Sequence, residues 1–364
     1  MKAGIVGLPN VGKSTLFNCL SNSKAQSANF PFCTIEPNIG VVNVPDNRLL
    51  TLESLVNPEK VIPATVEIVD IAGLVKGASK GEGLGNQFLG NIRETDAIIH
   101  VLRCFDNDNI IHVDGSVDPI RDKEIIDLEL QLKDLETVNK KLEKTVRTAK
   151  TGNKDAQKEL IILNKIKSHL ESLNSVRSID FDNEIYLAFV APLQLITDKP
   201  VLYVCNVDEN SAITGNHYVD SVKKLVSDEK AEVIILAVAI EADINELDDF
   251  EERKMFLEDL GLSEPGSSKL LRSTYKLLNL QTYFTAGVKE VRAWTISVGS
   301  TAPQAAGVIH TDFEKGFIRA EVISYENYVN YKTELKVKEA GKMNVEGKNY
   351  IVKDGDVMHF LFNV

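Results

Sequence analysis

Short apolar runs alternate with helical patterns along much of this chain. Residues 3–6 form an apolar run that ends in a glycine-rich turn, and a helical pattern follows it. Further apolar or alternating runs cover residues 61–70, 97–105, 201–206 and 233–238. Strands separated by helical patterns predict a mostly parallel sheet with helices on both faces. The fold class predicted for this part of the chain is therefore α/β.

One segment interrupts this alternation. Residues 124–173 show no strand pattern, and large aliphatic residues recur there at heptad spacing in two arms. The first arm contains Leu128, Leu132, Leu135, Leu142 and Val146, and the second contains Leu163, Ile166, Leu170 and Leu173. Residues 151–153, between the arms, favour a turn. The pattern predicts an antiparallel coiled-coil hairpin inserted at residues 124–185, with two ordinary surface helices as the alternative.

The pattern changes again after about residue 279. The predicted elements are strands at 288–298, 317–323 and 357–364, a helix near 301–309 and a hairpin at 341–352. This order fits a small mixed domain of the ubiquitin-like, or β-grasp, type. We predict two domains, one at 1–278 that carries the inserted hairpin and one at 279–364.

Composition and charge exclude several classes of protein. The chain has 364 residues, which suits two or three domains. Its formal net charge of −12 argues against a nucleic-acid-binding surface over the molecule as a whole, although a local patch can differ. The four cysteines form neither a CxxC motif nor a zinc-site spacing, which is typical of a reducing compartment. With no signal-peptide pattern and no apolar run of ~18–20 residues, we expect a cytoplasmic protein.

The first predicted strand leads into Gly-Leu-Pro-Asn-Val-Gly-Lys-Ser at residues 7–14, which matches the pattern GxxxxGK followed by Ser or Thr. In such a loop, backbone N–H groups and the N-terminus of the next helix surround phosphate oxygens. We expect Lys13 to bind the β- and γ-phosphates, Ser14 to bind Mg²⁺ and Thr15 to contact the α-phosphate. The motif predicts a P-loop nucleoside-triphosphate hydrolase.

Asp70 ends a predicted strand and begins Asp-Ile-Ala-Gly, which after a P-loop is typical of a DxxG switch element. We expect its carboxylate to hold Mg²⁺ through water and the Gly73 N–H to sense the γ-phosphate. Thr34 is the second hydroxyl predicted to bind Mg²⁺, with an ordinary loop residue as the alternative.

The group that orients the attacking water is less evident. GTPases of the Ras type place a glutamine just after DxxG, where this chain has Leu74. Another group must position the water, or hydrolysis is slow until a partner helps. His112, in the loop at residues 107–115, is a candidate, although a lone loop histidine more often has a structural role.

Residues 206–209 follow a predicted strand at the place where GTPases carry Asn-Lys-x-Asp, and their sequence is Asn-Val-Asp-Glu. We expect Asn206, Val207 and Glu209 to bind the nucleotide. In that motif the aspartate accepts two hydrogen bonds from guanine. Glu209 moves the carboxylate by about one methylene, so the paired contact is lost or strained and selectivity for guanine should fall. This argument predicts relaxed specificity and does not by itself predict a preference for adenine.

These motifs together resemble a known family. The P-loop, Leu74 and residues 83–89 (Gly-Leu-Gly-Asn-Gln-Phe-Leu) resemble the Obg-related GTPases. Asn206, Val207, Asp208 and Glu209 narrow the resemblance to the Obg-like ATPase, or YchF, family, and residues 355–360 (Gly-Asp-Val-Met-His-Phe) look like its C-terminal signature. The resemblance covers essentially the whole chain. It implies an OBG-type G domain with the coiled-coil insert, followed by a TGS domain.

The resemblance also implies an activity and a set of binding residues. The activity is ATP hydrolysis with Mg²⁺, with weaker use of GTP and with association to the ribosome. The implied phosphate-binding residues are Asn10, Val11, Gly12, Lys13, Ser14 and Thr15, and the implied magnesium ligands are Ser14 and Thr34. Val207 is implied to contact adenine through its backbone, and the loop holding His112 is implicated in hydrolysis. Leu361 departs from the family where a basic residue is common, which weakens any RNA contact by that strand.

Residues 139–167 carry a local positive charge. They contain nine Lys or Arg and three acidic residues, a balance of +6. A basic projection on an acidic body would be steered toward a phosphate backbone, so RNA is the expected partner, with a solvated helix face as the alternative. Because the resemblance implies association with the ribosome, we expect this RNA to be ribosomal RNA of the large subunit. We expect a monomeric, ribosome-associated ATPase that regulates translation or a stress response. The alternatives are an Obg-type GTPase in ribosome assembly and a nucleotide-gated RNA- or protein-binding module with incidental hydrolysis.

Overall fold

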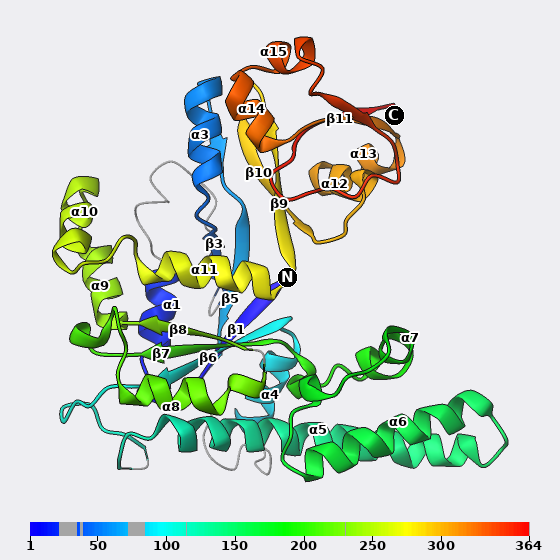
Figure 1. The fold of residues 1–364 in the computed structure, drawn as a ribbon. Coiled ribbons are helices and arrows are strands. Elements are labelled where there is room, and N and C mark those ends of the chain that lie inside the picture. The colour runs from blue at the N-terminus through cyan, green and yellow to red at the C-terminus, as the bar shows by residue number, and fades with distance from the viewer. Residues whose placement is uncertain (22–34, 37–38, 72–83, 114, 230, 364) are drawn as a thin grey trace. The chain divides into compact units, whose positions relative to one another are not determined.

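The computed structural model describes residues 1–21, 35–36, 39–71, 84–113, 115–229 and 231–363 (Figure 1). The described residues form two compact units. The first lies within residues 1–22, 35–40 and 68–267, and the second within residues 41–67 and 268–364. Residues 41–67 thus belong to the second unit, although segments of the first precede and follow them. The domain boundaries at 1–278 and 279–364 stay a prediction.

The first unit is built on a seven-stranded sheet in the order β2-β3-β5-β1-β6-β7-β8. The strands are β1 (Lys2–Val6), β2 (Ile35–Glu36), β3 (Ile39–Asn43), β5 (Thr65–Asp70), β6 (Ala97–Arg103), β7 (Val201–Asn206) and β8 (Glu232–Leu236). β1, β6, β7 and β8 pair in parallel, and β2 and β3 pair antiparallel. Every residue of β6 and β7 is buried, as expected for strands covered on both faces. The predicted α/β class is confirmed.

Helices cover both faces of this sheet (Figure 1). The helices of this unit are α1 (Lys13–Ser21), α4 (Leu84–Arg93), α5 (Pro119–Ala149), α6 (Lys154–Glu171), α7 (Asn183–Ile185), α8 (His217–Leu225), α9 (Val238–Glu246) and α10 (Phe250–Asp259). α1 packs against α9, and α5 packs against α8 and β6. Helix α11 (Gly266–Leu277) leads into the second unit. The strand predicted at 233–238 ends earlier, because Val238 already begins α9.

Helices α5 and α6 fold back on each other around the predicted turn (Figure 1). Val138 on α5 packs with Leu163, Ile166 and Leu170 on α6. The predicted seam is wrong at its ends, because Leu128 and Leu173 are 41% and 65% exposed. Helix α5, with 31 residues, is longer than α6, with 18, and it also packs against β6 and α8, so a coiled-coil spacing does not describe all of it.

The second unit contains a six-stranded sheet in the order β12-β11-β13-β9-β10-β4. The strands are β4 (Val61–Ile62), β9 (Leu280–Ala286), β10 (Val291–Ser297), β11 (Phe317–Ile323), β12 (Asn344–Glu346) and β13 (Val357–Phe362). The helices are α3 (Asn47–Val56), α12 (Ala302–Ile309), α13 (Thr311–Lys315), α14 (Tyr325–Tyr331) and α15 (Glu334–Glu339). β9 and β10 form a hairpin, β13 lies parallel to β9, and α12 packs against β10 and β11. This is the ubiquitin-like arrangement predicted for the C-terminal region.

Two predicted elements differ from the structure. The predicted hairpin at 341–352 is wrong, because β12 pairs with β11, while Ile351 bridges to Thr301. The run at 61–70 is two strands in two different sheets, β4 beside β10 and β5 in the first sheet. Pro63 lies between them, and proline lacks the N–H that a continuous strand would need. Among the described helices, none combines the length and apolar composition that a membrane span requires.

Candidate active site

The loop between β1 and α1 makes a tight turn that restricts its residues. Asn10 and Gly12 have φ angles of 64° and 94°, in the left-handed region. A Cβ atom at Gly12 would lie 2.4 Å from Nδ2 of Asn206, so this position excludes a side chain. The Asn10 amide donates to the carbonyl oxygen of Ile111 at 3.1 Å, which joins the P-loop to the loop after β6. The neighbouring Val11 is buried.

Lys13 and Asp70 meet at the start of α1. Nζ of Lys13 lies 2.8 Å from Oδ1 of Asp70, and the Ser14 hydroxyl donates to Oδ2 at 3.2 Å. Lys13 is 7% exposed, so the carboxylate neutralises an ammonium group that burial alone would penalise. Ser14 and Thr15 are exposed, where a ligand can reach them from solvent. The structure therefore brings the P-loop together with the end of β5.

The oxygen atoms at this point fit Mg²⁺. Magnesium prefers hard oxygen ligands and keeps several of its waters. The Ser14 hydroxyl and the Asp70 carboxylate supply such oxygens 3.2 Å apart. Thr34 and Gly73, which we also predicted to take part, lie outside the described residues, as does Leu74. The described part of the chain contains no group of three or more His, Cys, Asp or Glu residues that could hold a metal ion.

Asn206 supports the P-loop from the end of β7. Its amide donates to the carbonyl oxygen of Val11 at 2.9 Å and accepts from the Val238 N–H at 3.1 Å. The side chain is buried, so both contacts satisfy backbone groups that water does not reach. Asn206 thereby links three segments that are far apart in sequence. Its predicted contact with the nucleotide stays a prediction.

Residues 207–209, which follow Asn206, differ in exposure. Val207 is 2% exposed, and its N–H donates to the carbonyl oxygen of Leu236 at 3.0 Å. Its side chain therefore packs in the core. Because its N–H is already bonded, its carbonyl oxygen is the backbone group that could contact a ligand. Asp208 accepts hydrogen bonds from the N–H and hydroxyl of Ser211. Glu209 is exposed, so its carboxylate is accessible to a ligand.

His112 lies in a closed environment. Its side chain is 4% exposed, and Nε2 lies 2.8 Å from Oδ2 of Asp122, whose side chain is 1% exposed. Arg121 reaches the other oxygen of the same carboxylate at 3.2 Å. Burial raises the pKa of Asp122, while the bonds from His112 and Arg121 act in the opposite direction. In this conformation the imidazole is not accessible to a ligand that enters from solvent.

Sequence reasoning missed Arg103, which shapes the loop that carries His112. The guanidinium group is 2% exposed and donates to the carbonyl oxygens of Asn107 and Ile110 at 3.1 and 2.9 Å. It also lies 4.8 Å from the ring centre of Phe105. The sequence did contain a signal for this role, because an arginine at the end of an apolar strand is expected to be buried. A buried arginine needs several hydrogen-bond acceptors, which a nearby loop can provide.

The positive charges of the hairpin gather at its turn. Lys140 and Lys141 form ion pairs with Glu136 and Glu159. Five further basic residues around the turn are exposed, namely Lys144, Arg147, Lys150, Lys154 and Lys158. Nζ of Lys165 lies 5.0 Å from the ring centre of Phe181. The basic tip, defined here as these five exposed residues, is thus open to solvent.

Comparison with known proteins decides the family. Residues 2–165 match the family of 50S ribosome-binding GTPases, and residues 280–363 match the YchF-type GTPase C-terminal family, described as a protein of unknown function. The chain is 59% identical over 363 residues to the ribosome-binding ATPase YchF of Escherichia coli O157:H7, covering 100% of this chain and 99% of the relative. The chain belongs to the YchF family. The YchF protein of Bacillus subtilis (strain 168), also described as a ribosome-binding ATPase, is 54% identical over the full length of both chains.

A solved YchF structure supports the same assignment. The YchF GTPase of Schizosaccharomyces pombe is 41% identical and aligns with a TM-score of 0.90 over 99% of this chain and 97% of that chain. At this identity and coverage the resemblance seen in the sequence is confirmed. As a YchF-family member with a P-loop, this chain is a P-loop nucleoside-triphosphate hydrolase.

Proposed function

We propose that this YchF-family chain binds and hydrolyses ATP with Mg²⁺, uses GTP less well, and associates with the large ribosomal subunit to regulate translation or a stress response. The observation that carries the proposal is the meeting of Lys13, Ser14 and Asp70 beneath an exposed helix start. The relatives described as ribosome-binding ATPases support it.

Nucleotide binding exchanges the partners of Lys13. The ammonium group turns from Asp70 to the β- and γ-phosphates, and the N–H groups at the start of α1 surround the phosphate oxygens. The freed Asp70 carboxylate, through water, and the Ser14 hydroxyl would then hold Mg²⁺ with Thr34. Bound Mg²⁺ would neutralise charge on the β- and γ-phosphate oxygens. Thr15 contacts the α-phosphate, and Gly73 responds to the γ-phosphate.

The base loop favours adenine for a donor–acceptor reason. The Val207 N–H is occupied by Leu236, so a base at this position meets a carbonyl oxygen, which accepts hydrogen bonds. Adenine presents an N6 amine, a donor, whereas guanine presents O6, an acceptor that a carbonyl repels. Glu209 does not restore the aspartate geometry that guanine needs. Together these features make ATP the better substrate.

His112 acts in hydrolysis once its loop leaves the closed conformation. In that role it would orient the attacking water in place of the glutamine that Leu74 replaces. Because its side chain is 4% exposed in the closed conformation, basal hydrolysis is slow. A slow basal rate suits a regulator whose turnover a partner accelerates.

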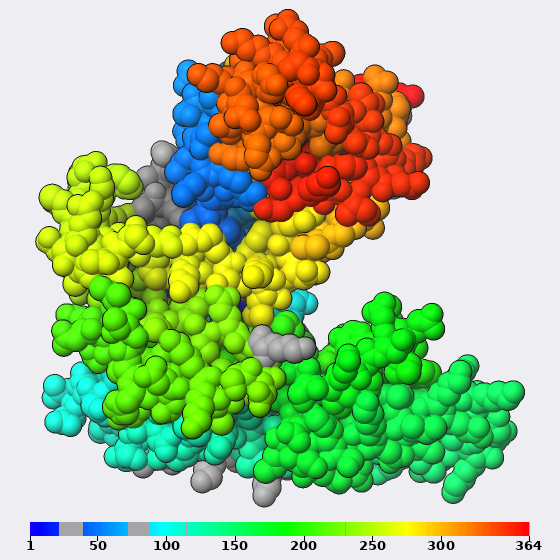
Figure 2. Space-filling view, in the orientation of Figure 1, coloured from blue at the N-terminus to red at the C-terminus, as the bar shows by residue number. Residues whose placement is uncertain are grey.

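The basic tip contacts ribosomal RNA. Its five side chains are exposed on α5 and α6 and around the turn between them. Figure 2 shows the surface that these two helices form. Contacts between such charges and phosphates position a protein without reading base sequence. The monomeric state and the cytoplasmic location remain predictions.

The test measures ATP turnover with and without large subunits, and subunit binding as a function of salt. We expect turnover with Mg²⁺-ATP that Lys13→Ala abolishes. The paired change Lys154→Gln and Lys158→Gln should reduce the slope of log affinity against log salt by about 1.4–1.8, since each phosphate contact contributes about 0.7–0.9. Lys336→Gln with Lys338→Gln, on α15, removes equal charge from two exposed positions and is the matched control. Equal effects of the two pairs would contradict the assignment to the tip.

A further inference from the structure

The segment that carries His112 exposes apolar side chains and buries its histidine. Ile111 and Val113 are 79% and 56% exposed, whereas His112 between them is 7% exposed. An aliphatic side chain in water forgoes the free energy of burial, and a buried imidazole requires a polar partner. This inverted arrangement is unfavourable on its own, so specific contacts must hold it in place.

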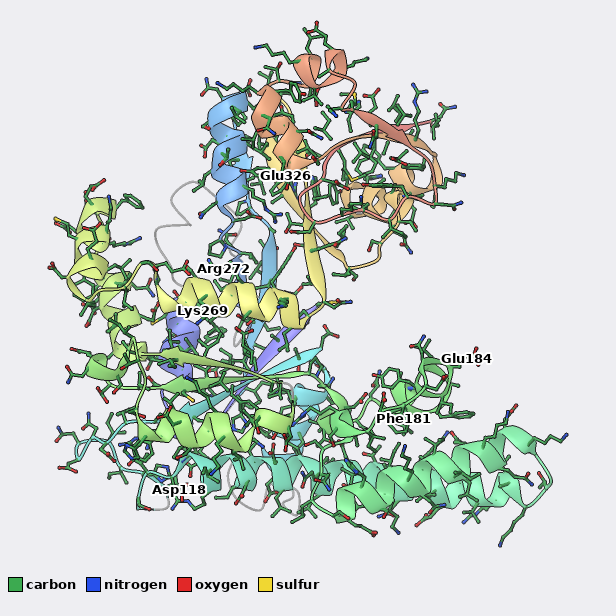
Figure 3. The ribbon with its side chains drawn as sticks, in the orientation of Figure 1. Asp118, Phe181, Glu184, Lys269, Arg272 and Glu326 are labelled. Carbon is green, nitrogen blue, oxygen red and sulfur yellow. The ribbon has the colours of Figure 1, made fainter. Side chains whose placement is uncertain are left out.

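Asp122 supplies the contact on the inner side. Its Oδ2 atom lies 2.8 Å from Nε2 of His112, and both side chains are nearly inaccessible, at 1% and 4% exposure. Asp122 lies in the first turn of α5, close to Asp118, which begins that helix by accepting from the N–H groups of Ile120 and Arg121 (Figure 3). The acid that holds His112 is therefore part of the helix that continues to the basic tip.

The P-loop supplies the contact on the outer side. The Asn10 amide donates to the carbonyl oxygen of Ile111, the residue directly before His112. On the other side of His112, Gly115 has a φ angle of 77°, and a Cβ atom there would meet nothing within 4 Å. The segment thus lies between Asn10 of the P-loop and a glycine with free space around it. A change at Asn10 can therefore move His112.

We propose that Asp122 is a positioning residue for hydrolysis, whose bond holds His112 in a stored position and still opposes the release that nucleotide binding favours. Release turns the segment over, so that Ile111 and Val113 move inward and the imidazole moves outward to the phosphates. The Asp122–His112 hydrogen bond is broken in this step, and the apolar burial that follows offsets its loss. The inference rests on the proposed role of His112 in hydrolysis.

The variant that tests storage is Asp122→Asn, measured as kcat and KM for ATP. Asparagine keeps the shape but replaces a charged acceptor with a neutral one, which weakens the bond to His112. We expect kcat to rise about tenfold, which corresponds to about 1.4 kcal/mol, with KM unchanged. Damage to the fold would lower kcat instead. An unchanged or reduced kcat overturns the proposal.

Asp118→Asn is the matched control. It alters the start of the same helix without touching His112, so kcat should stay at the wild-type value. An equal rise in both variants would show that loosening of α5, rather than release of His112, is responsible.

His112→Ala separates the proposed role of His112 in hydrolysis from its proposed storage by Asp122. If it hydrolyses ATP at the wild-type rate, the proposed role of His112 fails. If it is slow while Asp122→Asn is no faster than wild type, only the storage fails.

Hydrogen exchange of the unmodified protein tests the same step without a variant. A nonhydrolysable ATP analogue with Mg²⁺ should change the exchange of the amides of residues 110–113 at least severalfold, because the segment leaves its anchors. The amides of β6, which lie in the sheet core, provide the internal reference. Identical exchange with and without the analogue would overturn the proposal.

Discussion

Two basic side chains in this molecule are paired with aspartates at the same distance but differ in access. Lys13 lies 2.8 Å from Asp70 and His112 lies 2.8 Å from Asp122. The Asp70 side chain is 15% exposed, beside the exposed Ser14, whereas the Asp122 side chain is 1% exposed. A ligand can therefore compete for Lys13 directly, but His112 becomes available only after its loop moves.

This difference separates binding from turnover. We call Lys13 and Asp70 the open pair, and His112 and Asp122 the closed pair. In the open pair, Lys13 can exchange the aspartate for phosphate oxygens without a rearrangement of the fold, so we expect nucleotide binding to need little conformational change. On the proposed role of His112, the closed pair of His112 and Asp122 would add a barrier to hydrolysis that a partner could lower. We therefore expect this protein to bind nucleotide readily and to hydrolyse it slowly, which is the behaviour of a regulated switch.

The largest expected effect comes from the open pair. Lys13→Ala removes the charge that meets the β- and γ-phosphates, and we expect ATP affinity to fall on the order of 100- to 1,000-fold. Isothermal calorimetry with Mg²⁺ measures the change. Lys154→Ala, at the exposed hairpin tip, should leave ATP affinity unchanged. Retention of affinity within about threefold in Lys13→Ala would remove the distinction between the two pairs.

A smaller effect on ATP affinity is expected at Asn206, which supports the P-loop. Asn206→Ala leaves the Val11 carbonyl and the Val238 N–H without their partner, at a cost of about 1–3 kcal/mol in unfolding free energy. ATP affinity should fall as well, because the P-loop loses a support. Asn216→Ala is the control, since its amide also binds a buried carbonyl, that of Cys104, and begins α8. Denaturant unfolding should show similar costs, with ATP affinity lost only in Asn206→Ala.

At neutral pH, the smallest expected effect concerns a buried histidine in the sheet. Burial, together with the nearby positive charges of Lys123 and Arg177, lowers the pKa of His100 from 6.5 to about 3. The folded state keeps the ring neutral, while the unfolded chain takes up a proton below pH 6.5. His100 should therefore reduce unfolding free energy by up to about 1.4 kcal/mol per pH unit as pH falls toward 3.

The comparison variant for this prediction is His100→Leu. Its unfolding free energy should depend less steeply on pH than that of the wild type between pH 6 and 4, as followed by urea titration. The two proteins should have parallel pH profiles above pH 7.5. Parallel profiles throughout would show that His100 is already protonated in the fold or is not buried.

The sequence predicted the open site far better than the closed one. Lys13, Ser14 and Asp70 lie in contiguous motifs whose context fixes their geometry, and the structure brings them together as those motifs require. His112 and Asp122 are only ten positions apart, yet nothing in their spacing shows that both are buried. Burial there depends on how α5 packs, which is a tertiary property. The same limit explains Leu128, since a heptad spacing cannot tell which neighbour a helix faces.

The fold also has features that could be predicted from the sequence and features that could not. The buried runs of β6 and β7 were readable because strands covered on both faces are apolar throughout. The position of β4 beside β10 was not, because pairing between segments some 230 residues apart leaves no local pattern. A short strand such as β12 forms only where a partner strand is available to pair with it. The sequence at residues 341–352 suggested a partner within the same segment, whereas β12 pairs with β11.

The central claim, that this chain is an ATPase with a base loop that disfavours guanine, is tested most directly by calorimetry. ATP and GTP are titrated separately into nucleotide-free protein with Mg²⁺. The account predicts that ATP binds at least tenfold more tightly, which is about 1.4 kcal/mol. Equal or tighter binding of GTP would contradict the interpretation of Val207 and Glu209 and would indicate an Obg-type GTPase.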